Sequence, residues 1–360
     1  MNQRVALSPT AINSEINMLQ IFGSEWFGIP ISTLALSQVY ILIFEHYHDL
    51  VFLYIGETLT FAAIILFAFI FAIWITRGIA SRKEKNGNSH WDNLTRLSFI
   101  SLIPIMGFVS NSQLLFFFGI NSVSAEISAA DFYVFYGLSL ILGVLLGYRL
   151  YTKEISPREI NYAIVIPPLA IGTSVFLSQY IIQYYGGATG QFISFLVVMG
   201  LGIFFFLFIF IGSIALSGHV STKTHDALPT TMLPVGIASL IVLNLFAISG
   251  FGSIGNTSLT ISQVGLLSVM LWGFETWNFL VALILMLVRP SKGNLSVWAY
   301  GFPLGLFATS TIKIMSAINF GWLFWIFLMI SALLNILWVY GWINTALYIR
   351  KSRNHISQSA

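Results

Sequence analysis

The chain has 360 residues, of which 57% are hydrophobic, 16% are aromatic and only 8% are charged (16 Lys and Arg against 13 Asp and Glu). A soluble domain has about a quarter of its residues charged, so this charge is too sparse to cover a water-soluble body, and the mean hydropathy of +0.86 agrees. The composition excludes a soluble enzyme, a nucleic-acid binder and a secreted disulfide-rich module, and it predicts an integral membrane protein.

Ten apolar runs follow one another along the chain. A helix needs about 20 mostly apolar residues to cross the hydrocarbon core of a bilayer, and the runs of that length cover residues 26–44, 50–76, 97–118, 132–150, 162–184, 192–217, 230–252, 263–288, 297–318 and 322–349. They predict an all-α polytopic membrane protein. Its transmembrane domain covers residues 26–349, between a tail at 1–25 and a tail at 350–360.

The basic residues predict the orientation of these spans. Cytoplasmic loops carry an excess of Lys and Arg, and 15 of the 16 basic residues fall in the two tails or in the loops after spans two, four, six and eight. The sixteenth, Lys313, lies toward the opposite end. We therefore expect both termini in the cytoplasm and the spans in the plasma membrane.

Prolines recur in the odd-numbered spans. They are Pro30, Pro104, Pro167 with Pro168, Pro234 and Pro303, and the interiors of the even-numbered spans have none. An interior proline deletes a backbone hydrogen bond and kinks a helix, and the freed carbonyl needs a partner that lipid does not offer. The pattern predicts five helical hairpins with quasi-fivefold symmetry around a central pore, with kinked odd spans inside and even spans outside.

A bulky apolar residue precedes each proline or proline pair: Ile29, Ile103, Ile166, Leu233 and Phe302. At one height, these side chains would form a hydrophobic constriction of the kind that gates a pore by excluding water. Phe302 is the largest and the one aromatic member, so we expect it to dominate the constriction. Ordinary helix packing is the alternative role for this side chain.

Two segments resemble a known family. The segment from Trp298 to Lys313 reads WAYGFPLGLFATSTIK, and the segment from Glu25 to Ala35 reads EWFGIPISTLA. Both resemble helices of the tellurite-resistance/dicarboxylate transporter family, which includes plant slow anion channels, bacterial tellurite-resistance proteins, fungal malate permeases and yeast sulfite exporters. The resemblance implies an anion pathway through five inner helices, a pore gate at Phe302 and a homotrimer in which each protomer has its own pore.

Few ionisable residues lie in the spans, and such residues are functional candidates by default. Lys313, ten residues beyond Pro303, could attract anions to the mouth of the pore, or its amine could reach the lipid headgroups. Glu275 lies in the middle of the eighth span, where an ionised acid costs about 2.5 kcal/mol or more, and it departs from the family pattern. Glu275 and Glu57, in the second span, are candidate proton-linked or structural acids.

Two functions remain open. The first is a passive or weakly coupled channel or permease for small anions or organic acids. The second is a proton-coupled carrier for a C4-dicarboxylate such as malate, or for sulfite. An enzyme is not expected, because the chain has no H-E-x-x-H motif and no cysteine, and its six histidines all lie in loops or tails. No cofactor or metal is expected either.

Overall fold

A computed structural model of the chain describes residues 21–81, 94–152, 161–222, 228–251 and 259–359. Within these ranges all regular elements are helices, and ten helical stretches are long and apolar enough to cross a membrane, as predicted. The elements are η1 (Ser24–Phe27), α2 (Gly28–Tyr47), α3 (Leu50–Ser81), α4 (Leu94–Ile100), α5 (Leu102–Phe118), α6 (Ser122–Thr152), η3 (Tyr162–Val165), α7 (Ile166–Gly172), α8 (Ser174–Tyr185), α9 (Gly187–Thr222), η4 (Leu228–Met232), α10 (Leu233–Gly250), α11 (Ile261–Val288), η5 (Leu295–Tyr300), α12 (Gly301–Ile318) and α13 (Leu323–Ser359).

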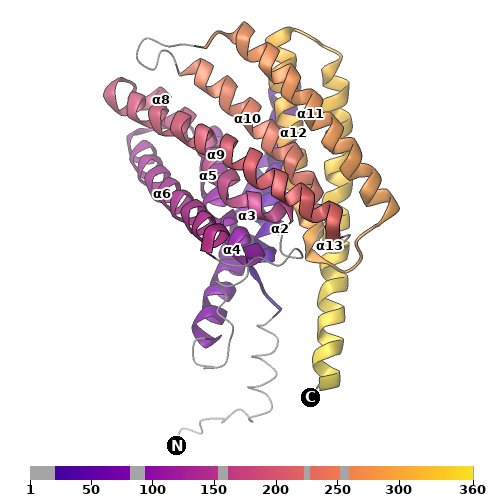
Figure 1. Ribbon diagram of the computed structural model, residues 1–360. Coiled ribbons are helices and arrows are strands. Elements are labelled where there is room, and N and C mark those ends of the chain that lie inside the picture. Colours follow the sequence, from indigo (N-terminus) through magenta and orange to yellow (C-terminus); the bar gives the residue numbers. More distant parts are fainter. Residues whose placement is uncertain (1–20, 82–93, 153–160, 223–227, 252–258, 360) are drawn as a thin grey trace, which may run out of the picture.

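Burial alternates along the chain. In the odd spans 67–83% of the residues of the most apolar segment are buried, whereas in the even spans the share is 17–39%. The odd spans are therefore the inner helices α2, α5, α7 with α8, α10 and α12, and the even spans α3, α6, α9, α11 and α13 cover them (Figure 1). The exposed side chains of the outer layer are large and apolar, for example Phe206, Phe210 and Trp325, which suits a surface that contacts lipid.

The first and last spans begin and end at the same end of the bundle. The ring centroids of Trp26, in η1, and Tyr348, near the end of α13, are 6.2 Å apart, and Arg77 at the end of α3 donates a hydrogen bond to the carbonyl of Phe22. The helix α13 continues from the predicted span through residues 350–359, so most of the predicted C-terminal tail is helical. Residues 1–20 of the predicted N-terminal tail lie outside the described residues.

Tight turns connect the inner helices to their outer partners at the other end. His48, Gly119, Gly186 and Asn319 follow α2, α5, α8 and α12, and each has a positive φ, between 54° and 73°. Glycine and asparagine adopt this region more readily than other residues, which makes them common helix terminators. Each inner helix that ends this way reverses into the following outer helix within a few residues, as the predicted hairpins require.

Candidate functional site: a cavity among the inner helices

Each proline or proline pair of the repeat lies in the first turn of an α-helix. The elements η1, η3, η4 and η5 are 3-10 helices that lead directly into α2, α7, α10 and α12, and α4 leads into α5 through a turn at Ser101. Pro30, Pro104 and Pro303 are the third residues of their α-helices, and Pro167 and Pro234 are second residues. Proline is well tolerated in the first turn, because an N–H there has no partner within the helix. All five inner spans therefore have a proline in the first turn of an α-helix that follows a shorter helix. The size of any bend at the proline remains a prediction.

The inner helices pack closely just beyond these junctions. A Cβ placed on Gly305 of α12 would lie 2.7 Å from Cβ of Ala35 on α2, and a Cβ on Gly236 of α10 would lie 2.7 Å from Cα of Pro303. Only glycine permits such an approach. The backbones of α2, α10 and α12 thus meet around Pro303, and the three helices leave little space between them there.

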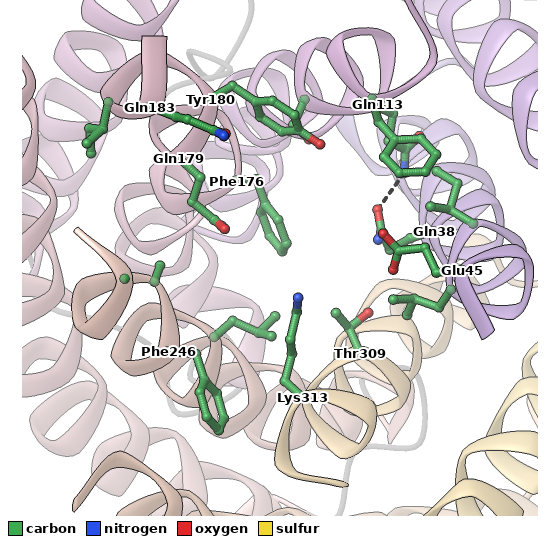
Figure 2. Close-up of a pocket in the computed structure, with 18 of the residues that line it drawn as sticks. Gln38, Glu45, Gln113, Phe176, Gln179, Tyr180, Gln183, Phe246, Thr309 and Lys313 are labelled. Atoms are coloured by element: carbon green, nitrogen blue, oxygen red, sulfur yellow. Dashed lines mark hydrogen bonds between the residues drawn. The ribbon is translucent and has the colours of Figure 1, made fainter. Parts of the chain in front are cut away.

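The opposite half of the bundle encloses a cavity of about 700 Å³. We call it the axial cavity, because all five inner spans contribute to its wall (Figure 2). Its lining residues are Gln38, Ile41, Leu42 and Glu45 from α2; Ser112, Gln113 and Phe116 from α5; Phe176, Gln179, Tyr180, Ile182 and Gln183 from α8; Leu243, Phe246, Ala247, Gly250 and Phe251 from α10 and the residue after it; and Thr309 and Lys313 from α12. Five spans that are distant in sequence converge on one space.

The wall of the axial cavity carries two charged side chains, Lys313 and Glu45, and both are exposed. Figure 2 shows the Lys313 amine directed toward the middle of the cavity. Amide groups of Gln38, Gln179 and Gln183 lie around it. An ammonium offers three N–H donors and an amide offers two, and the Gln179 amide already donates to the carbonyl of Val175. An anion entering this space therefore meets the Lys313 ammonium and the remaining amide N–H groups of α2 and α8.

Phe302 lies below the axial cavity on the same face of α12. At 100° per residue, Phe302, Leu306, Thr309 and Lys313 fall within about 60° of one another around the helix. Phe302 is 6% exposed and Leu306 is 3% exposed, and no residue of α12 before Thr309 lines the cavity. The line of side chains that starts at the Lys313 amine therefore continues downward into two buried apolar groups.

The other pre-proline residues differ in their position around the helix. Ile29, Ile166 and Leu233 are buried, and Ile103 is partly buried. At 100° per residue, Ile29 is turned about half a revolution from the cavity residue Gln38. Ile103 has the same relation to Ser112. The five-membered constriction at one height stays a prediction. The position around the helix favours Phe302, more than Ile29 or Ile103, as a residue that faces the pathway.

A hydrogen-bonded cluster lies under the cavity between α2, α3 and α5. Ser37 Oγ donates to the carbonyl of Gly56 at 2.7 Å, Thr60 Oγ1 donates to Gln113 Oε1 at 2.8 Å, and Gln113 Nε2 donates to the carbonyl of Leu34 at 2.9 Å. Satisfied buried polar groups hold helices in one arrangement. Gln113 thus serves packing as well as the cavity wall.

The two predicted acids have different surroundings. Glu57 is partly exposed on α3. Glu275 of α11 is 0% exposed, and its Oε2 accepts hydrogen bonds from Ser239 Oγ of α10 at 2.8 Å and Ser310 Oγ of α12 at 2.7 Å. Although α11 is an outer helix, this one side chain reaches the seam between two inner helices.

Sequence reasoning missed Glu45 as a cavity residue. The apolar run ended at residue 44, which placed Glu45 in a loop, whereas α2 continues to Tyr47. The signal was present in the spacing of Gln38, Ile41, Leu42 and Glu45, which is the i, i+3, i+4, i+7 pattern of one helix face.

Comparisons with known proteins agree with this architecture. The family described as voltage-dependent anion channel matches residues 21–346. An uncharacterized transporter of Methanocaldococcus jannaschii is 24% identical over 341 residues, covering 89% of this chain and 95% of the relative. A second uncharacterized transporter of that organism is 22% identical over 334 residues, covering 88% and 92%. No solved structure matches the chain. Because the family match extends from before the first span into the tenth, the chain belongs to the voltage-dependent anion channel family, which is the tellurite-resistance/dicarboxylate transporter family that its first and ninth spans resemble.

Proposed function

We propose that the protein is an anion channel or permease that passes small anions or organic acids along the axis of its five inner helices. The observation that carries the proposal is the axial cavity, in which all five inner spans meet around the Lys313 amine. The membership of the chain in a family of anion channels supports it. Both archaeal relatives are named as transporters, which supports transport as the general class of function.

In this proposal Phe302 occludes the pathway below the cavity. A pore closed by an aromatic ring excludes water, and an anion without water or a counter-charge does not cross an apolar segment. Phe302 and Leu306 are buried directly beneath the cavity residue Thr309 on one face of α12. Passage then requires these side chains to move aside, while Lys313 raises the local concentration of anions at the mouth.

Neutralising the positive and the negative side chain of the axial cavity, one at a time, tests this function. In proteoliposomes that contain the purified protein, we expect Lys313→Gln to lower chloride and nitrate flux about fivefold at low salt, because the cation near the pathway is lost. Glu45→Gln should raise the flux, because it removes the negative charge. Both effects should shrink as ionic strength rises.

The matched control is Lys292→Gln, a change of the same kind at an exposed residue that does not line the cavity. Its flux should equal that of the unmodified protein. If Lys313→Gln raises flux and Glu45→Gln lowers it, the cavity serves a cation and the proposal is wrong. If both variants have the flux of the unmodified protein, the axial cavity is not part of the pathway.

A second candidate function, a proton-coupled carrier for a C4-dicarboxylate or sulfite, is favoured by the burial of Glu275 beside two inner helices. Currents through single molecules in planar bilayers, recorded with chloride, nitrate, sulfite and malate in turn, distinguish the two. Resolved unitary currents indicate a channel, whereas saturable and electrically silent uptake indicates a carrier.

The assembly and the location are part of the proposal. We propose a homotrimer in the plasma membrane, with one pathway per protomer and both termini in the cytoplasm. The family resemblance supports the trimer, and the distribution of basic residues supports the orientation. The mass of the detergent-solubilised protein, measured by light scattering with correction for bound detergent, tests the trimer.

A further inference from the structure

Glu275 has an unusual position for a carboxyl group. It is the one acidic or basic residue of α11, it is fully buried, and its Oε1 has no hydrogen-bond partner. A buried ionised carboxylate without a positive partner is strongly unfavourable. The surroundings of this residue therefore decide which protonation state the protein holds.

No neighbouring element supplies a cation that pairs with Glu275. The elements that pack most closely on α11 are α10, α12 and η4, and Lys313 is the single titratable residue in those three sequences. Lys313 points into the axial cavity instead (Figure 2). The outer helix α9 contains one titratable residue, His219, three residues before its end, and the start of α13 contains none before Tyr340. Among the residues that the structure describes, Glu275 thus lacks a counter-charge.

The two serines that reach Glu275 can pair with a neutral carboxyl group without the help of a cation. Each serine hydroxyl has one hydrogen and a second acceptor within reach: Ser239 Oγ lies 2.9 Å from the carbonyl oxygen of Val235, and Ser310 Oγ lies 3.0 Å from that of Phe307. A protonated Glu275 can donate to one serine, which then donates to its own helix carbonyl. An ionised Glu275 would draw both hydrogens to Oε2 and leave Oε1 with no donor.

The carboxyl group lies directly behind the wall of the axial cavity. Ser310 follows Thr309, the lowest cavity residue of α12, and Ser239 lies one turn below Leu243, the first cavity residue of α10. Ser239 and Ser310 are both fully buried. Glu275 therefore adjoins the seam between α10 and α12 at the level where the cavity ends and the closed segment begins.

We propose that Glu275 is a proton-binding site in the wall of the anion pathway, and that anions pass when this site holds its proton. The inference rests on the proposed anion transport. With the proton bound, the wall is neutral and the serines join α10 to α12 through the acid. When the proton leaves for the water of the cavity, a negative charge remains behind the wall and repels an anion below Thr309. Flux is then higher at acidic pH than at alkaline pH.

The test is chloride flux in proteoliposomes at a series of pH values, set equal on both sides of the membrane. In the unmodified protein we expect flux to fall on the order of tenfold as pH rises, the effect of a like charge close to the pathway. Glu275→Gln cannot ionise, so its flux should stay at the acidic value at every pH. Glu126→Gln, the matched control at an exposed residue of the outer helix α6 that does not line the cavity, should keep the pH dependence of the unmodified protein.

A second variant covers the case in which Glu275→Gln does not fold. Ser310→Ala removes one of the two donors to the carboxylate, so the midpoint of its pH profile should move to higher pH, whereas a serine that only packs between helices would leave the midpoint in place. The carbonyl stretch of a protonated carboxylic acid gives a readout independent of transport. In infrared spectra of the protein in lipid, the Glu275 band should be present at neutral pH, shifted in Ser310→Ala and absent in Glu275→Gln.

The outcomes separate the two proposals. If no variant moves chloride faster than protein-free liposomes at any pH, the anion transport fails, and the infrared band still reports on the proton site. If the unmodified protein moves chloride and Glu275→Gln keeps the same pH profile, the role of Glu275 is wrong while the transport function stands. An ionised Glu275 at neutral pH in the infrared spectrum would also overturn the proton site.

Discussion

Two buried phenylalanines of α12, Phe302 and Phe307, face different parts of the molecule. Phe302 precedes the proline of the ninth span, it is buried, and it lies on the same face of α12 as the cavity residues Thr309 and Lys313. Phe307, five residues further on, is also buried but packs toward the outer layer, with its ring 5.5 Å from that of Phe279 and 6.3 Å from that of Trp272. The two residues form a natural pair for mutagenesis.

Phe302→Ala should raise anion flux in proteoliposomes by tenfold or more, on the order of the barrier that an apolar plug creates, while Phe307→Ala should leave the flux near that of the unmodified protein. Both truncations should lower stability by about 3–5 kcal/mol, as large-to-small changes in a core do. If both variants have the same flux after thermal unfolding confirms that both are folded, Phe302 is not the gate.

At the scale of the residue, the sequence identifies candidate site residues best where a charged side chain interrupts an apolar span. Lys313 and Glu275 stand out because charges are rare in the spans, and both have distinctive surroundings in the structure. Gln183 and Tyr180 line the cavity as well, but their types are common near the ends of membrane helices. Their position depends on the rotation of α8 about its axis, which a pattern of mixed apolar and polar residues does not specify.

At the scale of the element, the five inner spans begin alike for a physical reason. A proline in the first turn of an α-helix starts that helix without loss of a hydrogen bond, and the residues before it can wind as a 3-10 helix. The sequence predicts the break in each span from the proline alone. The 3-10 helices that precede four of the five breaks were not predicted, because they depend on how the preceding turn packs against the neighbouring spans.

The close approach of α12 to α2 gives a prediction about stability. Gly305→Ala should destabilise the protein by about 1–3 kcal/mol, because the added Cβ would lie 2.7 Å from Ala35 Cβ and 3.1 Å from the Ala35 carbonyl oxygen. The control is Gly137→Ala in α6, where nothing lies within 4 Å of the added atom. Alanine there should be neutral or stabilising by up to about 1 kcal/mol.

The measurement is the midpoint of thermal unfolding in detergent, followed by the loss of the folded peak in size-exclusion chromatography. We expect a lower midpoint for Gly305→Ala than for the unmodified protein and an unchanged or higher midpoint for Gly137→Ala. Equal midpoints in the two variants would mean that α2 and α12 separate easily, which would contradict tight packing at the closed end.

At the scale of the whole molecule, the division into inner and outer helices was predictable and the cavity was not. The alternation of proline-containing and proline-free spans indicates which helices lie inside, and the burial of the odd and even spans confirms it. The volume of the cavity and its position in one half of the bundle result from side chains of five helices that pack together. No single segment of the chain carries that information.

The orientation of the molecule can be tested with single cysteines, because the natural chain has none. Ser122→Cys lies after the turn that follows α5, and Ser352→Cys lies near the end of α13. A charged, membrane-impermeant maleimide should label Ser122→Cys on intact cells and Ser352→Cys only after permeabilisation, as expected when Lys and Arg accumulate on the cytoplasmic side. The reverse pattern would contradict cytoplasmic termini.

The one-sided cavity also determines where the membrane voltage acts. Water in an open cavity shares the potential of the solution with which it is continuous, so the voltage falls across the closed part of the bundle. From Thr309 to Phe302 is seven residues, about 10 Å along the helix, against about 30 Å of hydrocarbon. In the proposed pathway, an anion that crosses the closed part of the bundle, to which this stretch belongs, gains or loses most of the roughly 2.3 kcal/mol per 100 mV that a unit charge carries across a membrane. The side chains between the cavity floor and Phe302 would then lie within the electric field and not at the potential of the outer solution.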